Sequence, residues 1–252
     1  MADPVEIALV YPELLGTYGD GGNALVLARR LTRRGIDARV TAVGITEAVP
    51  RQADIYLLGG GEDSPQFTAL DALHASGALH DAVARGAVVL AVCAGFQLIG
   101  TELVDGSNNT INGLGLVDAV TTRAPKRLVG EVAVRDDALG TGWLVGFENH
   151  RGVTAVGPGV TPLGPRQPDE LSATDGAVHG RVVGTYLHGP VLARNPRLAD
   201  TLLEWVVGPL APLADPQADL LHEERYAAIT GARQRARRVL RRPRRRTRQP
   251  QP

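Results

Sequence analysis

The sequence contains very little cysteine: Cys93 is the only one among 252 residues. A single thiol excludes an internal disulfide framework and a zinc site built from several cysteines. It also suits a reducing compartment, so we expect a cytoplasmic protein without a metal site.

Long apolar runs and targeting signals are missing as well. No apolar run approaches the ~18 residues of a transmembrane helix, and the first residues lack the basic and apolar regions of a signal peptide. No G-x-x-x-x-G-K-S/T run is present, so we expect no ATP-binding P-loop. The spacing Gly19-x-Gly21-x-x-Ala24 matches a dinucleotide-binding variant, but it does not follow the preceding predicted strand directly, which argues against NAD binding.

Acidic and basic residues number 27 each, but they are not evenly mixed. Ten arginines and no acidic residue lie between Arg233 and the C-terminus. Removing those ten leaves 17 basic against 27 acidic residues, a net charge of −10 for the rest of the chain. We predict one domain over residues 1–232 and a disordered basic tail over 233–252. This tail is either simply solvated or contacts the anionic inner face of the membrane.

Hydrophobic patterning predicts strands that alternate with helices in the first hundred residues. The predicted strands are 5–11, 38–43, 54–58, 87–92, 116–121, 129–134, 144–147 and 181–187, and the predicted helices are 23–34, 68–85, 195–207 and 216–242, with a short helix after Cys93. Such alternation is typical of a parallel sheet covered by helices on both faces. We therefore expect a doubly wound, mostly parallel α/β fold.

Cys93 lies where a predicted strand meets a helix. The preceding run Val88–Val92 is continuously apolar, as in a strand covered on both faces. Ala94 and Gly95 are small, as a tight strand-to-helix turn requires, and such a turn lifts the residue at its apex out of the sheet. The N-terminus of the following helix favours a thiolate. A lone cysteine is usually a small buried hydrophobe, but this setting predicts a nucleophile.

A cysteine nucleophile requires a base. His188 is the favoured candidate, because it ends a second apolar strand, at the sheet edge where open α/β folds bind ligands. His150 also ends a strand-like run and is the rival candidate. Cysteine and histidine that lie far apart in sequence, each at a strand end, can meet as a nucleophile–base pair.

Three glycines, Gly59, Gly60 and Gly61, directly follow another predicted strand. They form either a flexible loop or part of an oxyanion hole, and the turn at Cys93 favours the second interpretation. Glycine lets the backbone approach a substrate closely. We expect the N–H groups of Gly60 and Ala94 to bind the oxygen of a tetrahedral intermediate.

Six short motifs occur in order along the chain. They are residues 18–23 (YGDGGN), 58–63 (LGGGED), 92–97 (VCAGFQ), 126–130 (KRLVG), 146–150 (GFENH) and 184–190 (GTYLHGP). Together they resemble the class I (triad-type) glutamine amidotransferases, in the branch that contains the amidotransferase domain of cobyric acid synthase. The resemblance extends to about Arg225 and implies the flavodoxin-like fold and the glutaminase activity of that family.

The resemblance also implies roles for individual residues. Cys93 would attack the side-chain amide carbon of L-glutamine, and His188 would carry the thiol proton to the leaving ammonia. Water activated by His188 would then release glutamate from a γ-glutamyl thioester. Arg127 would bind the α-carboxylate of glutamine, which suits a planar guanidinium. Gln97 is the remaining residue expected to contact the substrate.

Asp20 has two interpretations. Most triad-type amidotransferases carry a glutamate two residues after the histidine, and here that position is Pro190, which cannot orient an imidazole. Asp20 either supplies the missing acid or only caps the helix that follows it.

Within its branch, the chain resembles glutaminase subunits that act with a separate Mur-ligase-like subunit of the MurT type. This implies a heterodimer in which ammonia made here amidates D-glutamate of lipid II to D-isoglutamine during peptidoglycan synthesis. ATP and Mg²⁺ are expected on the partner, and no cofactor is expected in this chain. A subunit for another acceptor and a stand-alone γ-glutamyl hydrolase are the alternatives. A binding module with a decayed site is disfavoured, because Cys93, His188 and Arg127 are all present.

Overall fold

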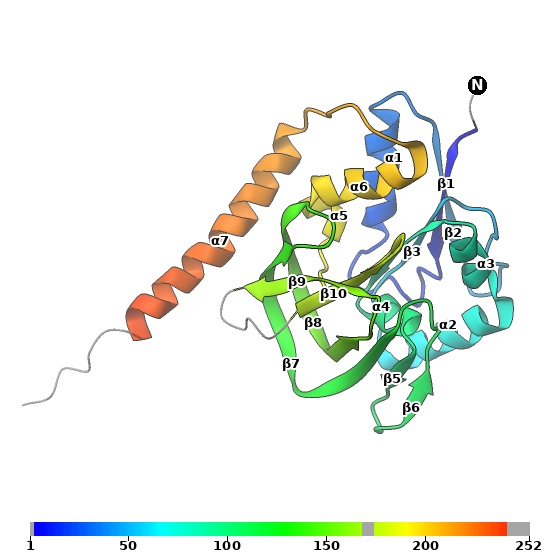
Figure 1. Cartoon of the computed structure of the whole chain (residues 1–252), viewed down its shortest axis with the longest axis horizontal. Coiled ribbons are helices and arrows are strands. Elements are labelled where there is room, and N and C mark those ends of the chain that lie inside the picture. The colour runs from blue at the N-terminus through cyan, green and yellow to red at the C-terminus, as the bar shows by residue number, and fades with distance from the viewer. Residues whose placement is uncertain (1–2, 168–173, 241–252) are drawn as a thin grey trace, which may run out of the picture.

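The computed structural model describes residues 3–167 and 174–240, which fold around one mixed sheet (Figure 1). The strands are β1 (Val5–Val10), β2 (Ala38–Val43), β3 (Ile55–Leu58), β4 (Val88–Val92), β5 (Glu102–Val104), β6 (Thr110–Asn112), β7 (Ala119–Asp136), β8 (Gly142–Val156), β9 (Thr161–Gln167), β10 (Thr174–His179) and β11 (Val182–Thr185). The helices are α1 (Gly22–Thr32), α2 (Asp63–Ser76), α3 (Ala78–Ala84), α4 (Ala94–Ile99), α5 (Val191–Arg194), α6 (Pro196–Val207) and α7 (Pro216–Leu240).

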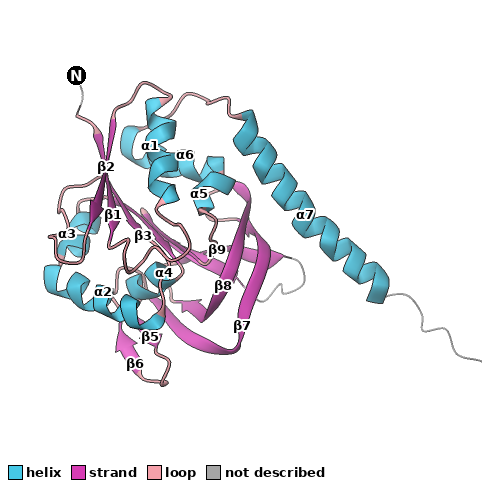
Figure 2. Cartoon of the chain, turned by 180° about the vertical axis from the view of Figure 1, so that it is seen from behind, coloured by secondary structure: helices cyan, strands magenta, loops and turns pink. Residues whose placement is uncertain are grey.

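The first half of the sheet is parallel, in the strand order β2-β1-β3-β4-β11. Every residue of β3, β4 and β11 is buried, as expected of strands covered on both faces. The helices α1, α5 and α6 lie on one side of this half, and α2, α3 and α4 lie on the other (Figure 2). The predicted doubly wound α/β architecture is confirmed. In such a sheet the carboxyl ends of the strands form the edge that binds ligands.

The second half of the sheet is largely antiparallel and contains two long strands, β7 and β8. They pair over nearly their whole length, with one irregularity between Arg123 and Leu128. The predicted strands 116–121 and 129–134 therefore belong largely to one strand. Pro125 lies between the two predicted strands, and proline usually interrupts a strand. Here it falls in the irregular part of the ladder and breaks no regular pairing.

The predicted helix 68–85 is two helices, α2 and α3, with Gly77 between them. Gly77 has φ +61°, in the left-handed region, and its N–H donates to the carbonyl oxygen of Leu73 at 3.1 Å. This is the usual way in which a glycine ends a helix. The first of the two helices also begins earlier than predicted, at Asp63.

The last helix, α7, packs on the antiparallel half with part of its length and then projects from the body (Figure 1). The rings of Trp143 and Tyr226 are 5.4 Å apart, and Ile229 is buried in a small apolar cluster. α7 runs past the domain boundary predicted at residue 232, and the tail segment 241–252 lies outside the described residues. Among the described helices, none is long and apolar enough to span a membrane.

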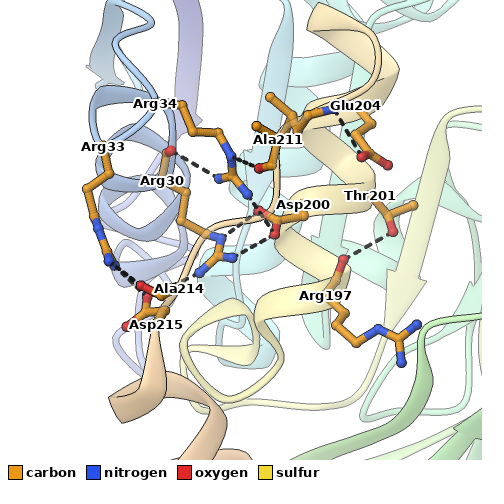
Figure 3. Close-up of polar contacts among 11 residues, drawn as sticks. Arg30, Arg33, Arg34, Arg197, Asp200, Thr201, Glu204, Ala211, Ala214 and Asp215 are labelled. Atoms are coloured by element: carbon orange, nitrogen blue, oxygen red, sulfur yellow. Dashed lines mark hydrogen bonds and ion pairs between the residues drawn. The ribbon is translucent and has the colours of Figure 1, made fainter.

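An ion-pair network joins α1 to α6 and to the segment before α7 (Figure 3). Arg30, which is buried, donates two hydrogen bonds of 2.7 Å to Asp200, and Arg34 contacts the same carboxylate at 3.0 Å. Arg33 pairs with Asp215 at 2.8 Å. Burial raises the pKa of Asp200, but the hydrogen bonds and charges of the two arginines outweigh it, so the pKa is lowered. The network therefore fixes α1 against α6.

Candidate functional site

Cys93 forms the apex of a tight turn between β4 and α4, as predicted. Its backbone has φ +53° and ψ −104°, a region that costs a non-glycine residue on the order of 1–3 kcal/mol. Its N–H donates to the carbonyl oxygen of Thr185 at 2.8 Å, which ties the turn to β11. A Cβ added to Gly95 would lie 2.8 Å from the carbonyl oxygen of Leu58. Gly95, two residues after the cysteine, therefore needs to be small for helix α4 to pack against β3.

The surroundings of Cys93 disfavour its thiolate form. Burial, followed by the negative charge of Asp20, raises its pKa to about 12. A hydrogen bond from the backbone N–H of Ala94 and the charge of Arg127 lower the pKa, but by less than burial and Asp20 raise it. Because α4 has only six residues, its dipole is short. The helix N-terminus therefore does not offset the burial of the sulfur, and attack requires a base that removes the proton.

His188 follows β11, the strand next to β4, so that it and Cys93 leave the carboxyl ends of neighbouring parallel strands. Its backbone exchanges two hydrogen bonds with Phe147 of β8, at 2.8 and 3.0 Å. Its Nδ1 lies 3.5 Å from Oδ2 of Asp20, and both side chains are 2% exposed. Within the described residues, both ring nitrogens are buried without a hydrogen-bond partner, so the contact with Asp20 is that of a charge pair and Nε2 is free to accept a proton. A base awaiting a proton has this arrangement.

Asp20 does not cap the helix that follows it. The N-cap of α1 is Gly21, and no side chain hydrogen-bonds to the end of the helix there. The carboxylate instead faces His188 and accepts the backbone N–H of Gly60 at 2.7 Å. The geometry therefore favours the interpretation in which Asp20 orients the imidazole.

The glycine loop after β3 packs directly against this pair. A Cβ on Gly60 would lie 2.6 Å from Cε1 of His188, so a side chain at this position would displace the ring. The N–H of Gly60 already donates to Asp20, which conflicts with its predicted role as an oxyanion donor. Gly61, the next residue, lines the pocket in front of Cys93. The glycine predicted as a donor therefore has a different place, beside the histidine.

The pocket in front of Cys93 contains several of the predicted residues. Ala94, Gln97 and Arg127 line it together with the cysteine. The histidine and aspartate do not line it and lie buried beside it. The predicted set therefore divides into residues that face the pocket and a buried pair, His188 and Asp20, that does not line it.

Arg127 is linked to the buried pair through two residues that the sequence did not single out. Its Nε donates to Oδ1 of Asn149 at 2.5 Å, and Nδ2 of Asn149 donates to the hydroxyl of Tyr18 at 3.0 Å. The ring of Tyr18 lies against that of His188, with centroids 4.4 Å apart. Both residues belong to recognised motifs, 18–23 and 146–150, but their contact joins positions 131 residues apart, which sequence spacing does not reveal.

His150, the rival base, lines the same pocket but is held by other groups. Its ring stacks on Tyr186 with centroids 3.8 Å apart. Its Nδ1 lies 2.8 Å from the carbonyl oxygen of Gly152, and its Nε2 lies 3.5 Å from Glu148. Glu148 also pairs with Arg166. Both histidines therefore have a carboxylate 3.5 Å away. They differ in that Nδ1 of His150 lies against a backbone carbonyl oxygen, whereas His188 follows the strand next to β4 and Cys93.

Comparison with known proteins agrees with this geometry. Residues 6–196 match the model of the CobB/CobQ-like glutamine amidotransferase domain. The chain belongs to the CobB/CobQ-like glutamine amidotransferase family.

Two relatives are subunits named GatD of lipid II isoglutaminyl synthase (glutamine-hydrolyzing). The protein from Staphylococcus aureus is 34% identical over 75% of this chain and 79% of its own length. The protein from Streptococcus pneumoniae is 33% identical over 79% of both chains. Cobyric acid synthase of Sphingopyxis alaskensis is 32% identical over 62% of this chain but only 32% of its own length.

Solved structures confirm the fold of a glutamine amidotransferase. The crystal structure of one glutamine amidotransferase superposes with a TM-score of 0.53 at 21% identity, over 80% of this chain and 98% of that one. A glutamine amidotransferase from Thermotoga maritima gives a TM-score of 0.54 at 15% identity, over 89% and 91%. At these identities the likeness concerns the fold alone.

Proposed function

We propose that this amidotransferase is the glutaminase subunit of a lipid II isoglutaminyl synthase, and that it supplies ammonia to a MurT-like ATP-dependent ligase subunit. The observation that carries the proposal is the buried His188–Asp20 pair beside a strained Cys93 and a pocket that also contains Arg127. The two GatD relatives, which are matched over most of their length, supply the acceptor and the two-subunit organisation.

Glutamine hydrolysis begins with a neutral thiol, because the pKa of Cys93 is raised. As the sulfur attacks the side-chain amide carbon, the thiol proton passes to Nε2 of His188. The carboxylate of Asp20, 3.5 Å from Nδ1, stabilises the imidazolium. The carbonyl oxygen of the substrate becomes an oxyanion. The N–H of Ala94, which donates a hydrogen bond to the sulfur in the resting protein, can then donate to this oxyanion instead.

The imidazolium then donates its proton to the departing nitrogen, so that ammonia leaves and a γ-glutamyl thioester remains. Water attacks the thioester carbon and gives its proton to His188. The carbon–sulfur bond breaks, the sulfur recovers a proton from the imidazolium, and glutamate leaves. Each turnover therefore consumes one glutamine and one water, and produces glutamate and ammonia with the thiol restored.

The ammonia is useful only if it reaches an activated acyl group before water protonates it. In this proposal the partner activates the acceptor with ATP and Mg²⁺ and docks near the carboxyl edge of the sheet. The chain would therefore act at the cytoplasmic side, where lipid II is assembled.

The test uses purified full-length chain with and without the ligase subunit. The chain alone should hydrolyse glutamine but not amidate lipid II, and the complex with ATP and glutamine should amidate it. In a complex carrying Cys93→Ala, glutamine should fail as a nitrogen source, whereas a high concentration of ammonium should restore the product. Amidation by the chain alone, or glutamine-dependent amidation by the Cys93→Ala complex, would contradict the proposal. Glutaminase activity with no effect on any ligase would instead favour a stand-alone γ-glutamyl hydrolase.

A further inference from the structure

The pocket in front of Cys93 has an uneven distribution of charge. Three arginines face it: Arg123, Arg127 and Arg151. Among its described lining residues, the one carboxylate is that of Glu62. The proposed substrate, L-glutamine, carries one positive and one negative group at its α-carbon. The pocket therefore offers a partner of opposite charge for each of these groups.

The backbone of Glu62 is held by hydrogen bonds, but its side chain makes no structural hydrogen bond within the described residues. It is the N-cap residue of α2, yet its carboxylate makes no capping hydrogen bond. Its carbonyl oxygen accepts the N–H of Gln66 at 3.0 Å. The loop that leads to it is anchored by Gly59, whose carbonyl oxygen accepts the N–H of Gly95 at 3.1 Å. Across the described residues, the carboxylate has neither a hydrogen bond nor an ion pair, and it is exposed to the pocket.

Glu62 and Arg127 line the same pocket as the Cys93 thiol and carry charges of opposite sign. The charge of Arg127 lowers the pKa of Cys93, and the charge of Glu62 raises it. Neither side chain is hydrogen-bonded to the sulfur. In L-glutamine, two methylene groups separate the reacting amide from the carbon that bears the α-ammonium and α-carboxylate groups. Two opposite charges in the pocket of the thiol match the two opposite charges that this substrate carries at its α-carbon.

We propose that Glu62 binds the α-ammonium group of L-glutamine while Arg127 binds its α-carboxylate, and that Glu62 thereby restricts the site to free glutamine. This assignment rests on the proposed glutaminase function. A glutamine within a peptide has its α-nitrogen acylated and uncharged, so it would leave the carboxylate of Glu62 facing a neutral group. Glu62 is therefore a specificity residue that acts through substrate charge and takes no part in proton transfer.

The test compares two amides that differ only in the α-ammonium group: L-glutamine and glutaramate. The variant is Glu62→Gln, and the matched control is Glu224→Gln, which makes the same change at an exposed position on α7. In Glu62→Gln, kcat/KM for glutamine should fall roughly ten- to a hundredfold, as expected for losing a hydrogen bond between charged groups. With glutaramate, kcat/KM should stay within about twofold of wild type, and the control should match wild type on both substrates.

The comparison separates this role from a general effect on the thiol. Removing the negative charge also shifts the pKa of Cys93, but that shift changes both substrates by the same factor. Equal losses on glutamine and glutaramate, or no loss on either, would overturn the assignment. The inhibition constant of glutaramate against glutamine hydrolysis gives the same comparison where its turnover is slow. Absence of glutaminase activity in the wild-type chain would refute the proposed function itself, which is a separate outcome.

Discussion

The substitution Asp20→Asn removes one charge from the buried pair and nearly preserves its shape. The asparagine oxygen can still accept the N–H of Gly60, which Asp20 accepts at 2.7 Å. Stability should therefore change little. The carboxylate lies 3.5 Å from Nδ1 of His188, and both side chains are 2% exposed. A charge pair about 4 Å apart contributes about 4 kcal/mol for an effective dielectric constant near 20, and this pair is slightly closer.

That energy sets the expected loss of activity. The imidazolium forms only as Cys93 attacks, so the missing charge destabilises the transition state more than the resting enzyme. A loss of about 4 kcal/mol corresponds to a fall in kcat of roughly a thousandfold. A second effect has the opposite sign. The charge of Asp20 contributes to raising the pKa of the Cys93 thiol, so the variant should have a lower thiol pKa and should be alkylated at lower pH than wild type.

The assay pairs glutaminase kinetics with the pH profile of iodoacetamide alkylation at Cys93, and a melting curve serves as the control for folding. The variant should turn over far more slowly although its thiol is more readily ionised. An activity within about threefold of wild type, with an unchanged alkylation profile, would refute the role assigned to Asp20. A large fall in melting temperature would show that the residue is mainly structural.

Four further outcomes follow from the structure. Gly60→Ala should lower kcat by about a hundredfold, because the new Cβ would lie 2.6 Å from Cε1 of His188 and displace the ring. Steady-state kinetics should show this fall at an unchanged melting temperature, and a normal kcat would contradict the prediction. Arg127→Lys should raise the KM for glutamine about tenfold or more with little change in kcat, because lysine lacks the planar guanidinium that binds a carboxylate through two hydrogen bonds. An unchanged KM would exclude a contact between Arg127 and the substrate. Asp200→Asn should cost about 3 kcal/mol by chemical denaturation at neutral pH. The pKa of Asp200 is lowered in the folded state, so its contribution is full above the unfolded pKa and disappears as pH falls through the folded value; the gap between variant and wild type should therefore close below about pH 4. Truncation after Gly231 should leave glutaminase activity unchanged, and salt-sensitive binding to anionic vesicles that disappears on truncation would favour a membrane role for the tail.

The parallel half of the fold was predictable because its signals are local. The run at β4 is apolar throughout, and the small residues after Cys93 mark the turn before α4 directly in the sequence. The antiparallel half was harder to predict. β9 carries two prolines and a glycine within seven residues, which is the composition of a turn. It is a strand because β10 and β7 pair with it on either side, and that pairing is a tertiary effect.

The site also combines features that local sequence signals predict with features that depend on tertiary packing. The positions of Cys93 and His188 follow from strand ends and could be predicted from the sequence. The part played by Asp20 could not, because an aspartate before a helix is equally suited to capping, and only the packing of the glycine loop brings it to the imidazole. The conflict at Gly60 has the same origin, because its N–H donates to a carboxylate 40 residues away in the sequence.

The central claim is that Cys93 is the nucleophile of a glutaminase, and covalent labelling tests it most directly. An electrophilic glutamine analogue should inactivate the full-length chain, and mass spectrometry of the digested protein should place the adduct on the peptide that contains Cys93. Glutamine should protect against labelling, and Cys93→Ala should show neither labelling nor glutaminase activity while keeping the wild-type melting temperature. An adduct on another residue, or full glutaminase activity in Cys93→Ala, would contradict the account.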